Sequence, residues 1–193
     1  MVEALASELD ASLSRALAAV RAKTSVGGVR RVWIDIGTWR QTLSKADLEA
    51  DESLIVIGLE ALAANLNSSL HPVTPRFVRV LGACSDGPAG TFVTFQQHTS
   101  PSCGSLLPTH RSAPRVGKGS DACVGDVPRP VRVRSVPLSL LIDRVRAVLH
   151  ARIELVKIDV QGSEVDCVAS AAASLRSVDN LLLEAQVTFH GLP

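Results

Sequence analysis

The stretch IELVKIDVQGSE, residues 153–164, carries the clearest change of pattern in the chain. Its first half is almost continuously apolar, as in a strand that is buried on both faces of a parallel sheet. Gly162 then permits a sharp turn, and Glu164 follows at the start of a helical pattern, where the helix dipole favours an acid. We therefore predict a strand that passes directly into a helix, which is the repeating unit of α/β sheets.

Similar apolar runs recur along the chain and alternate with helical patterns. The strands expected in one mostly parallel sheet lie at residues 32–36, 54–59, 77–83, 154–160 and 181–187, with a possible hairpin strand at 91–96. The helices expected between them lie at residues 44–50, 61–70, 137–149 and 164–175. Because parallel crossovers are right-handed, these helices should cover both faces, which gives an α/β fold of the Rossmann-like type.

The length of 193 residues suits one domain. Residues 1–28 are expected to form an N-terminal helix that packs on the core, because leucines recur there at the spacing of one helix face. Residues 29–193 then form the α/β domain. Within it, residues 98–130 are rich in Pro, Gly, Ser and Arg and lack periodicity, which predicts a long flexible loop over the carboxyl edge of the sheet.

The bulk composition excludes several classes of protein. The net charge is +1 and aromatic residues make up 3%, so neither a basic nucleic-acid surface nor a base-stacking platform is expected. The chain has no run of about 18 apolar residues, so no membrane span is predicted. Its N-terminus lacks the basic start and apolar stretch of a signal peptide, and a cytoplasmic location is therefore the default expectation.

The four cysteines match no zinc-binding spacing. Cys84 and Cys167 lie in apolar stretches and are predicted to be small core residues. Cys103 and Cys123 both fall in the long loop, and pairing between them in an oxidising compartment is left open.

Ligands of open α/β sheets bind at the carboxyl ends of the strands, near the point where the strand order reverses. This rule directs attention to the residues at strand ends, namely Asp35, Gly37, Glu60, Asp86 and Asp159. Gly37 lets the backbone approach a ligand closely. A carboxylate at Asp35 would repel a pyrophosphate but suits a cationic ligand, whereas capping of the following turn is the structural alternative.

Two other charged positions have a functional and a structural interpretation. Glu60 ends the second apolar run, where an acid accepts ribose hydroxyls of a nucleoside, or where it simply sits at a helix N-terminus. Lys157 and Asp159 share one face of an otherwise apolar strand, and charged residues are rarely buried there without a partner or a task. A Lys–Asp pair followed by a helix-start acid at Glu164 is the alternative to a catalytic cluster.

Four segments resemble the FkbM family of methyltransferases in order and spacing. They are VWIDIG (32–37), VIGLEALAANL (56–66), FVRVLGACSDGPAG (77–90) and VKIDVQGSEVDCVASAAASL (156–175). The run KIDVQGSE is similar to that family's Lys-Ile-Asp-Val-Glu-Gly-x-Glu signature. The resemblance covers Val29 to about Gln186. It implies a Rossmann-like methyltransferase fold, S-adenosyl-L-methionine (SAM) as methyl donor, and transfer usually to a hydroxyl oxygen of a small molecule or sugar.

For such a transferase, the candidate cofactor contacts are strand-end residues and their neighbours: Asp35, Gly37, Thr38, Glu60, Ala61 and Asp86. Methyl transfer needs mainly orientation of the reactants, since the donor is already activated. A general base assists when the acceptor is a hydroxyl. Asp159 is the first candidate for this base because it ends a core strand that faces the cofactor side, and Glu164 is the second.

Two features depart from the family pattern. The family has a second glycine soon after Asp-x-Gly, whereas this chain has Thr38-Trp39-Arg40-Gln41, and these bulky residues predict weaker SAM binding. The methyltransferase fold also normally carries two further strands after the one that ends near Val187, where six residues remain, Thr188 to Pro193. The C-terminal strands therefore look missing from this sequence.

These departures keep two other functions in view. A catalytically weak or inactive binding scaffold with the same fold is the main alternative. An NAD-type oxidoreductase is disfavoured by the acid that ends the first strand and by the absence of GxGxxG.

Overall fold

A five-stranded parallel sheet lies at the centre of the computed structural model, which describes residues 1–23, 30–39, 45–99, 103–107 and 127–184. The strands run in the order β3-β2-β1-β6-β7. Their bounds are β1 (Arg31–Ile36), β2 (Leu54–Glu60), β3 (Phe77–Leu81), β6 (Arg152–Ile158) and β7 (Val178–Leu183). The predicted α/β fold with a mostly parallel sheet is confirmed. The last strand begins and ends earlier than the predicted 181–187.

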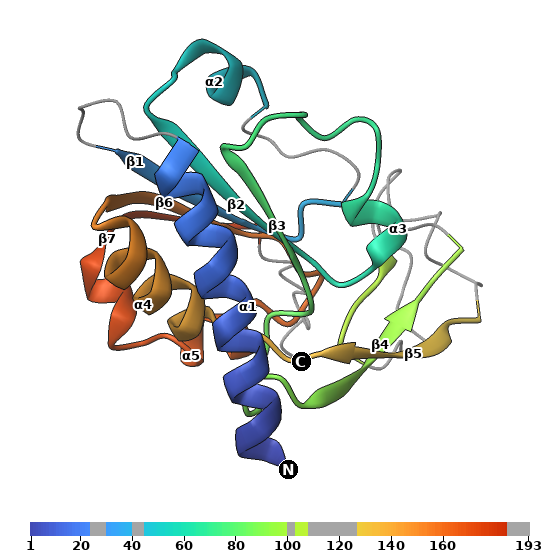
Figure 1. Cartoon of the computed structure of the whole chain (residues 1–193). Coiled ribbons are helices and arrows are strands. Elements are labelled where there is room, and N and C mark those ends of the chain that lie inside the picture. Colours follow the sequence, from blue (N-terminus) through green and yellow to red (C-terminus); the bar gives the residue numbers. More distant parts are fainter. Residues whose placement is uncertain (24–29, 40–44, 100–102, 108–126, 185–193) are drawn as a thin grey trace, which may run out of the picture.

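Helices cover both faces of this sheet. Their bounds are α1 (Val2–Lys23), α2 (Lys45–Ala50), α3 (Ala63–Leu66), α4 (Leu138–Leu149) and α5 (Glu164–Ala169), followed by the 3-10 turn η3 (Ser174–Ser177). α1 and α4 lie side by side across one face (Figure 1), and their buried side chains join those of the central strands in the main core. α2 packs on the other face through Leu48, which clusters with Leu54, Val56 and Phe77. None of the helices in the described residues is long and apolar enough to cross a membrane.

A separate two-stranded antiparallel sheet lies beside the carboxyl ends of the parallel strands (Figure 1). It consists of β4 (Phe92–Gln97) and β5 (Arg129–Arg134), so β4 confirms the hairpin strand predicted at 91–96. The predicted long loop therefore ends in a strand, and its Ser105 also pairs with Gln96 of β4. Residues 100–102 and 108–126 of that loop lie outside the described residues.

Two predicted helices are shorter than expected, because side chains compete for their backbone groups. The helix expected at 61–70 is only α3, where Asn67 is the C-cap and the Ser68 hydroxyl accepts from the Leu70 N–H at 3.2 Å. The helix expected at 164–175 stops at Ala169. There, the Ser170 hydroxyl donates to the Cys167 carbonyl at 2.6 Å and accepts from the Leu138 N–H at 3.0 Å.

Cys84 and Cys167 are buried in the main core, as predicted, but their pairing was not predicted. They form a buried disulfide whose Cα atoms are 5.3 Å apart, although 83 residues separate them in sequence. The disulfide ties the segment after β3 to α5. Cys103 is also disulfide-bonded, whereas Cys123 lies outside the described residues.

Candidate functional site

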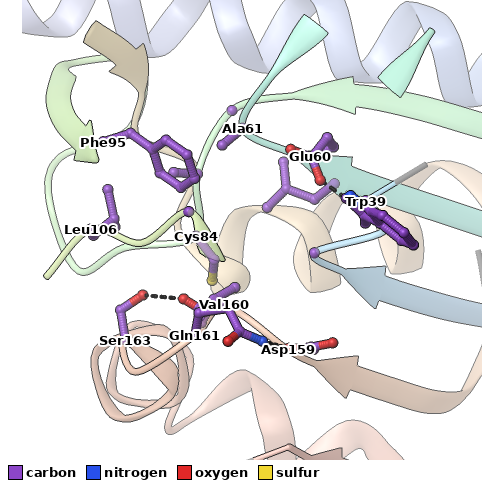
Figure 2. Close-up of a pocket in the computed structure, with 15 residues that line it drawn as sticks. Trp39, Glu60, Ala61, Cys84, Phe95, Leu106, Asp159, Val160, Gln161 and Ser163 are labelled. Atoms are coloured by element: carbon purple, nitrogen blue, oxygen red, sulfur yellow. Dashed lines mark hydrogen bonds between the residues drawn. The ribbon is translucent and has the colours of Figure 1, made fainter. Parts of the chain in front are cut away.

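A pocket opens at the carboxyl ends of β1, β2, β3 and β6 and has an empty volume of about 680 Å³, part of it open to solvent. The sheet order reverses between β1 and β6, so this pocket lies at the switch point where open α/β sheets bind ligands. Its wall carries the side chains shown in Figure 2: Trp39, Glu60, Ala61, Cys84, Phe95, Leu106, Asp159, Val160, Gln161 and Ser163.

The strand register explains why acids from distant parts of the sequence meet here. Ile36 pairs with Leu59 on one side and with Ile158 on the other, and Ile158 pairs with Leu183. The next residues along these four strands are therefore neighbours, and they are Glu60, Gly37, Asp159 and Glu184. Three carboxyl groups thus flank one glycine at the edge of the sheet.

Gly37 is required by the closeness of two backbones. Its φ of +79° lies in the left-handed region, and a Cβ built on it would stand 1.9 Å from the Asp159 carbonyl oxygen. The Gly37 N–H donates to the Leu59 carbonyl at 2.9 Å, and the Asp159 N–H donates to the Ile36 carbonyl at 3.0 Å. A glycine is therefore needed where β1 and β6 meet at the floor of the pocket.

Lys157 connects two of the predicted acids. Its ammonium lies 3.5 Å from Asp35 Oδ1 and 3.2 Å from Asp159 Oδ2, and it also donates to the Gly37 carbonyl at 3.4 Å. Asp159 lines the pocket, and its Oδ1 accepts from Gln161 Nε2 at 2.8 Å. Asp35 is buried and does not line the pocket. Asp35 is therefore linked to the Asp159 carboxylate through Lys157, and the Lys–Asp pair expected as an alternative is present.

Glu60 lines the pocket from the end of β2 and is 6% exposed. Its Oε1 accepts from the Leu62 N–H at 2.9 Å and from Asn65 Nδ2 at 3.3 Å, and its Oε2 accepts from the Trp39 N–H at 2.9 Å. Burial raises the pKa of this carboxyl above its ordinary value, while these hydrogen bonds oppose the shift. The Glu60 carboxylate thus binds backbone N–H groups of two turns, the one after β1 and the one after β2.

Three other predicted cofactor contacts have different surroundings. Ala61 lines the pocket next to Glu60. Thr38 is buried outside the pocket, with its N–H donating to the Leu59 carbonyl at 3.3 Å. Asp86 is exposed and does not line the pocket. Only Gly37, Glu60 and Ala61 of the six predicted contacts therefore face this cavity.

Glu164, the second predicted catalytic residue, is buried at the start of α5 and is not in the pocket wall. Its Oε1 accepts from the Val160 and Gly162 N–H groups at 3.1 and 3.0 Å. These bonds hold the turn that follows β6, in which Gln161 has a φ of +57°. The contacts of Glu164 are therefore those of a turn-stabilising acid, while Asp159 is the acid in the wall.

Glu184, which follows β7, was not singled out from the sequence. The Glu184 N–H donates to the Ile158 carbonyl at 3.0 Å, which places this residue beside Asp159. The negative charge of Asp159, a hydrogen bond with it, and burial together raise the pKa of Glu184. The signal was available, since Glu184 directly follows the apolar run 181–183 as Asp159 follows its own.

Replacing Glu184 by glutamine is expected to stabilise the fold near pH 7 but not near pH 3. A raised pKa means that the folded state binds this proton more tightly than the unfolded state. The stability contributed by Glu184 is therefore full at low pH and is lost as the pH rises through its folded pKa. Urea unfolding of both proteins at the two pH values measures this difference. The exposed Glu52→Gln is the matched control, and an equal effect of Glu184→Gln at both pH values would contradict the repulsion.

Of the comparisons with known proteins, one gave a match. Residues 26–191 match the family model described as the methyltransferase FkbM domain. No curated protein and no solved structure matches the chain significantly.

Proposed function

The chain belongs to the FkbM methyltransferase family, and we propose that it uses SAM to methylate a hydroxyl oxygen of a small molecule or sugar. The observation that carries this proposal is the acidic, glycine-floored pocket at the switch point of the sheet. Among the described residues of its wall, both side chains that titrate are acids, Glu60 and Asp159. Such a site suits a cationic nucleoside better than a pyrophosphate.

The residues present fit SAM on two counts. At Gly37, any side chain would meet the Asp159 backbone, so the floor is open only because this residue is glycine. At Glu60, Oε1 accepts from the Leu62 N–H and Asn65 Nδ2, whereas Oε2 accepts from the Trp39 N–H. A carboxylate oxygen can accept two hydrogen bonds, so a ribose hydroxyl would be the second donor to Oε2. Gly37, Glu60 and Ala61 would hold the cofactor, while Asp35 would act by fixing Lys157.

SAM supplies a methyl group on a sulfonium, and its transfer leaves a neutral thioether. The acceptor oxygen gains that methyl group and loses its hydroxyl proton, for which Asp159 is the proposed recipient. Lys157 and Gln161 fix the Asp159 carboxylate from two sides, so it is positioned before the acceptor arrives. Phe95 and Leu106 form an apolar end of the pocket in Figure 2, which would reduce the contact of a bound acceptor with water.

Replacing Glu60 by alanine is expected to weaken SAM binding by about ten- to a hundredfold. Each charge-assisted hydrogen bond to a ribose hydroxyl contributes roughly 1.5–3 kcal/mol, and 1.4 kcal/mol corresponds to a tenfold change in affinity. Titration calorimetry with SAM and with its demethylated product, S-adenosylhomocysteine, measures the loss for both ligands. Because the ribose is common to both, the two losses should be equal.

The control for this titration is Glu52→Ala, which removes an exposed acid from the turn just before β2. Thermal unfolding of each variant shows whether Glu60→Ala is folded at the temperature of the titration. If folded Glu60→Ala binds SAM as tightly as the unchanged protein, the ribose assignment is wrong.

A catalytically weak binding scaffold is the second candidate function. One observation favours it: Glu164 is committed to the turn after β6, so Asp159 is the only one of the two predicted catalytic acids in the described pocket wall. Methyl-labelled SAM incubated with a panel of sugars and phenols separates the two candidates. Tight SAM binding without transfer to any hydroxyl compound would favour the scaffold, and a labelled ether product would establish the transferase.

A further inference from the structure

Trp39 has a backbone conformation that is costly for its residue type. Its φ of +49° lies in the left-handed region, which bulky side chains rarely adopt. This position belongs to the turn that follows β1. An aromatic residue kept in such a conformation points to a use for its side chain.

Two buried groups hold Trp39 in this conformation. Its N–H donates to Glu60 Oε2 at 2.9 Å, and its carbonyl oxygen accepts from His71 Nε2 at 3.1 Å. The His71 ring is buried and stacks on Phe77 with centroids 5.1 Å apart. Burial lowers the pKa of His71, so its ring is a neutral donor near pH 7. The backbone of Trp39 is therefore held on both sides of its Cα atom, which fixes the direction of the Cα–Cβ bond.

That side chain lies at the acidic end of the pocket. Figure 2 shows the indole beside Glu60 and on the opposite side of the pocket from Phe95 and Leu106. Trp39 is 44% exposed although it lines the cavity. The sequence contains only two tryptophans and no tyrosine. The other tryptophan, Trp33, does not line the pocket, and its indole N–H donates to Glu154 Oε2 at a distance of 3.0 Å.

We propose that the Trp39 indole is a ligand contact that recognises the sulfonium of SAM, an inference that rests on the proposed methyltransferase function. An aromatic face attracts a cation within about 6 Å of its centre, and tryptophan does so most strongly. The carboxylates of Glu60 and Asp159 draw a cation to the same end of the pocket. The sequence alone predicts that Trp39 hinders the cofactor. The half-exposed indole in the pocket wall, on a backbone held by Glu60 and His71, indicates a contact instead.

Three substitutions separate these two roles. Trp39→Phe keeps an aromatic face, Trp39→Leu keeps apolar bulk without one, and Trp39→Ala removes both. Cation–π contacts of about 0.5–2 kcal/mol correspond to roughly two- to thirtyfold in affinity. We therefore expect Trp39→Leu and Trp39→Ala to lower the affinity for SAM more than the affinity for S-adenosylhomocysteine, whose sulfur is neutral. The two losses should differ by that roughly two- to thirtyfold factor. Trp39→Phe should lose the least. Calorimetric titration of both ligands gives the affinities.

Tryptophan fluorescence gives a readout that does not depend on activity. In a Trp33→Phe background, Trp39 is the single tryptophan, so its emission should change when SAM is added. The strain is tested by comparing Trp39→Gly with Trp39→Ala, which lack the same ring but differ in tolerance of a positive φ. The glycine variant should have the higher melting temperature, and equal or reversed melting temperatures would contradict the strain.

The outcomes distinguish this inference from the function on which it rests. If SAM binds to the unchanged protein and Trp39→Leu binds it as well or better, Trp39 is not a sulfonium contact, and the methyltransferase proposal stands. The inference also fails if Trp39→Leu lowers the affinities for SAM and for S-adenosylhomocysteine equally, since Trp39 would then contact another part of the ligand. If neither the unchanged protein nor Trp39→Gly binds either ligand, both proposals fail.

Discussion

The double replacement of Cys84 and Cys167 by alanine is expected to lower the free energy of unfolding by about 4 kcal/mol. The disulfide closes a loop across 83 residues of sequence. For a loop of this length, the chain-entropy model assigns the cross-link about 4–5 kcal/mol, within the range of roughly 2–5 kcal/mol seen when native disulfides are removed. Both cysteines are at most 1% exposed, so alanine also leaves a small apolar void.

Urea unfolding of both proteins under non-reducing conditions measures this loss. Because an unfolded chain without the cross-link is less compact, the slope of the transition should also rise, and the free energies rather than the midpoints must be compared. Adding a reductant to the double variant is the control, since any further loss then comes from the disulfide of Cys103. Equal unfolding free energies for the two proteins would mean that the disulfide adds no net stability to the fold.

The disulfide also bears on where the protein works. Disulfides persist in oxidising compartments and are rare in the reducing cytosol. The cytoplasmic location predicted from the N-terminus stays a prediction, and the buried Cys84–Cys167 bond weighs against it. Thiol counting on protein isolated without reductant from its native source distinguishes the two locations, because a cytosolic protein should yield free thiols.

The fold was largely predictable because its signal is local. Apolar runs such as residues 54–59 are buried at every position, and that continuity is visible in sequence. The helix at Ala63–Leu66 was overestimated because the sequence pattern does not show that Asn67 becomes its C-cap and that the Ser68 hydroxyl binds the Leu70 N–H. The pairing of Cys84 with Cys167 depends on where β3 and α5 end relative to each other, and periodicity carries no such information.

The candidate site was predictable only in outline. The rule that ligands bind at strand ends found Gly37, Glu60 and Asp159, which the register does bring together. It ranked Asp159 above Glu164 but kept both as candidates for the base, because their roles depend on which backbone N–H groups each carboxylate faces. It also missed that Lys157 is the ion-pair partner of both Asp35 and Asp159. Recognising this double contact requires the positions of all three residues in space, which the sequence does not give.

Replacing Gly37 by alanine is expected to destabilise the fold by about 2–4 kcal/mol and to weaken SAM binding more than a hundredfold, which at 1.4 kcal/mol per tenfold is about 3 kcal/mol. The new Cβ would stand 1.9 Å from the Asp159 carbonyl oxygen, a backbone atom that cannot rotate away. The ends of β1 and β6 must therefore separate, and the 3.0 Å bond from the Asp159 N–H to the Ile36 carbonyl is lost. The φ of +79° adds strain for any residue with a side chain.

Gly87→Ala is the matched control for this change, because the nearest atom to its Cβ would be the Ser135 hydroxyl oxygen at 3.3 Å, a side-chain atom outside the pocket wall. It should alter stability by no more than about 0.5 kcal/mol and leave SAM binding unchanged. Urea unfolding and calorimetric titration of both variants give the two quantities. Gly37→Ala should lower both the stability and the affinity for SAM. The contact between the Gly37 and Asp159 backbones joins the ends of β1 and β6 and also forms the floor of the pocket. If Gly37→Ala loses stability but keeps its affinity for SAM, the cofactor does not lie over the junction of β1 and β6, and the site must be sought elsewhere on the carboxyl edge of the sheet.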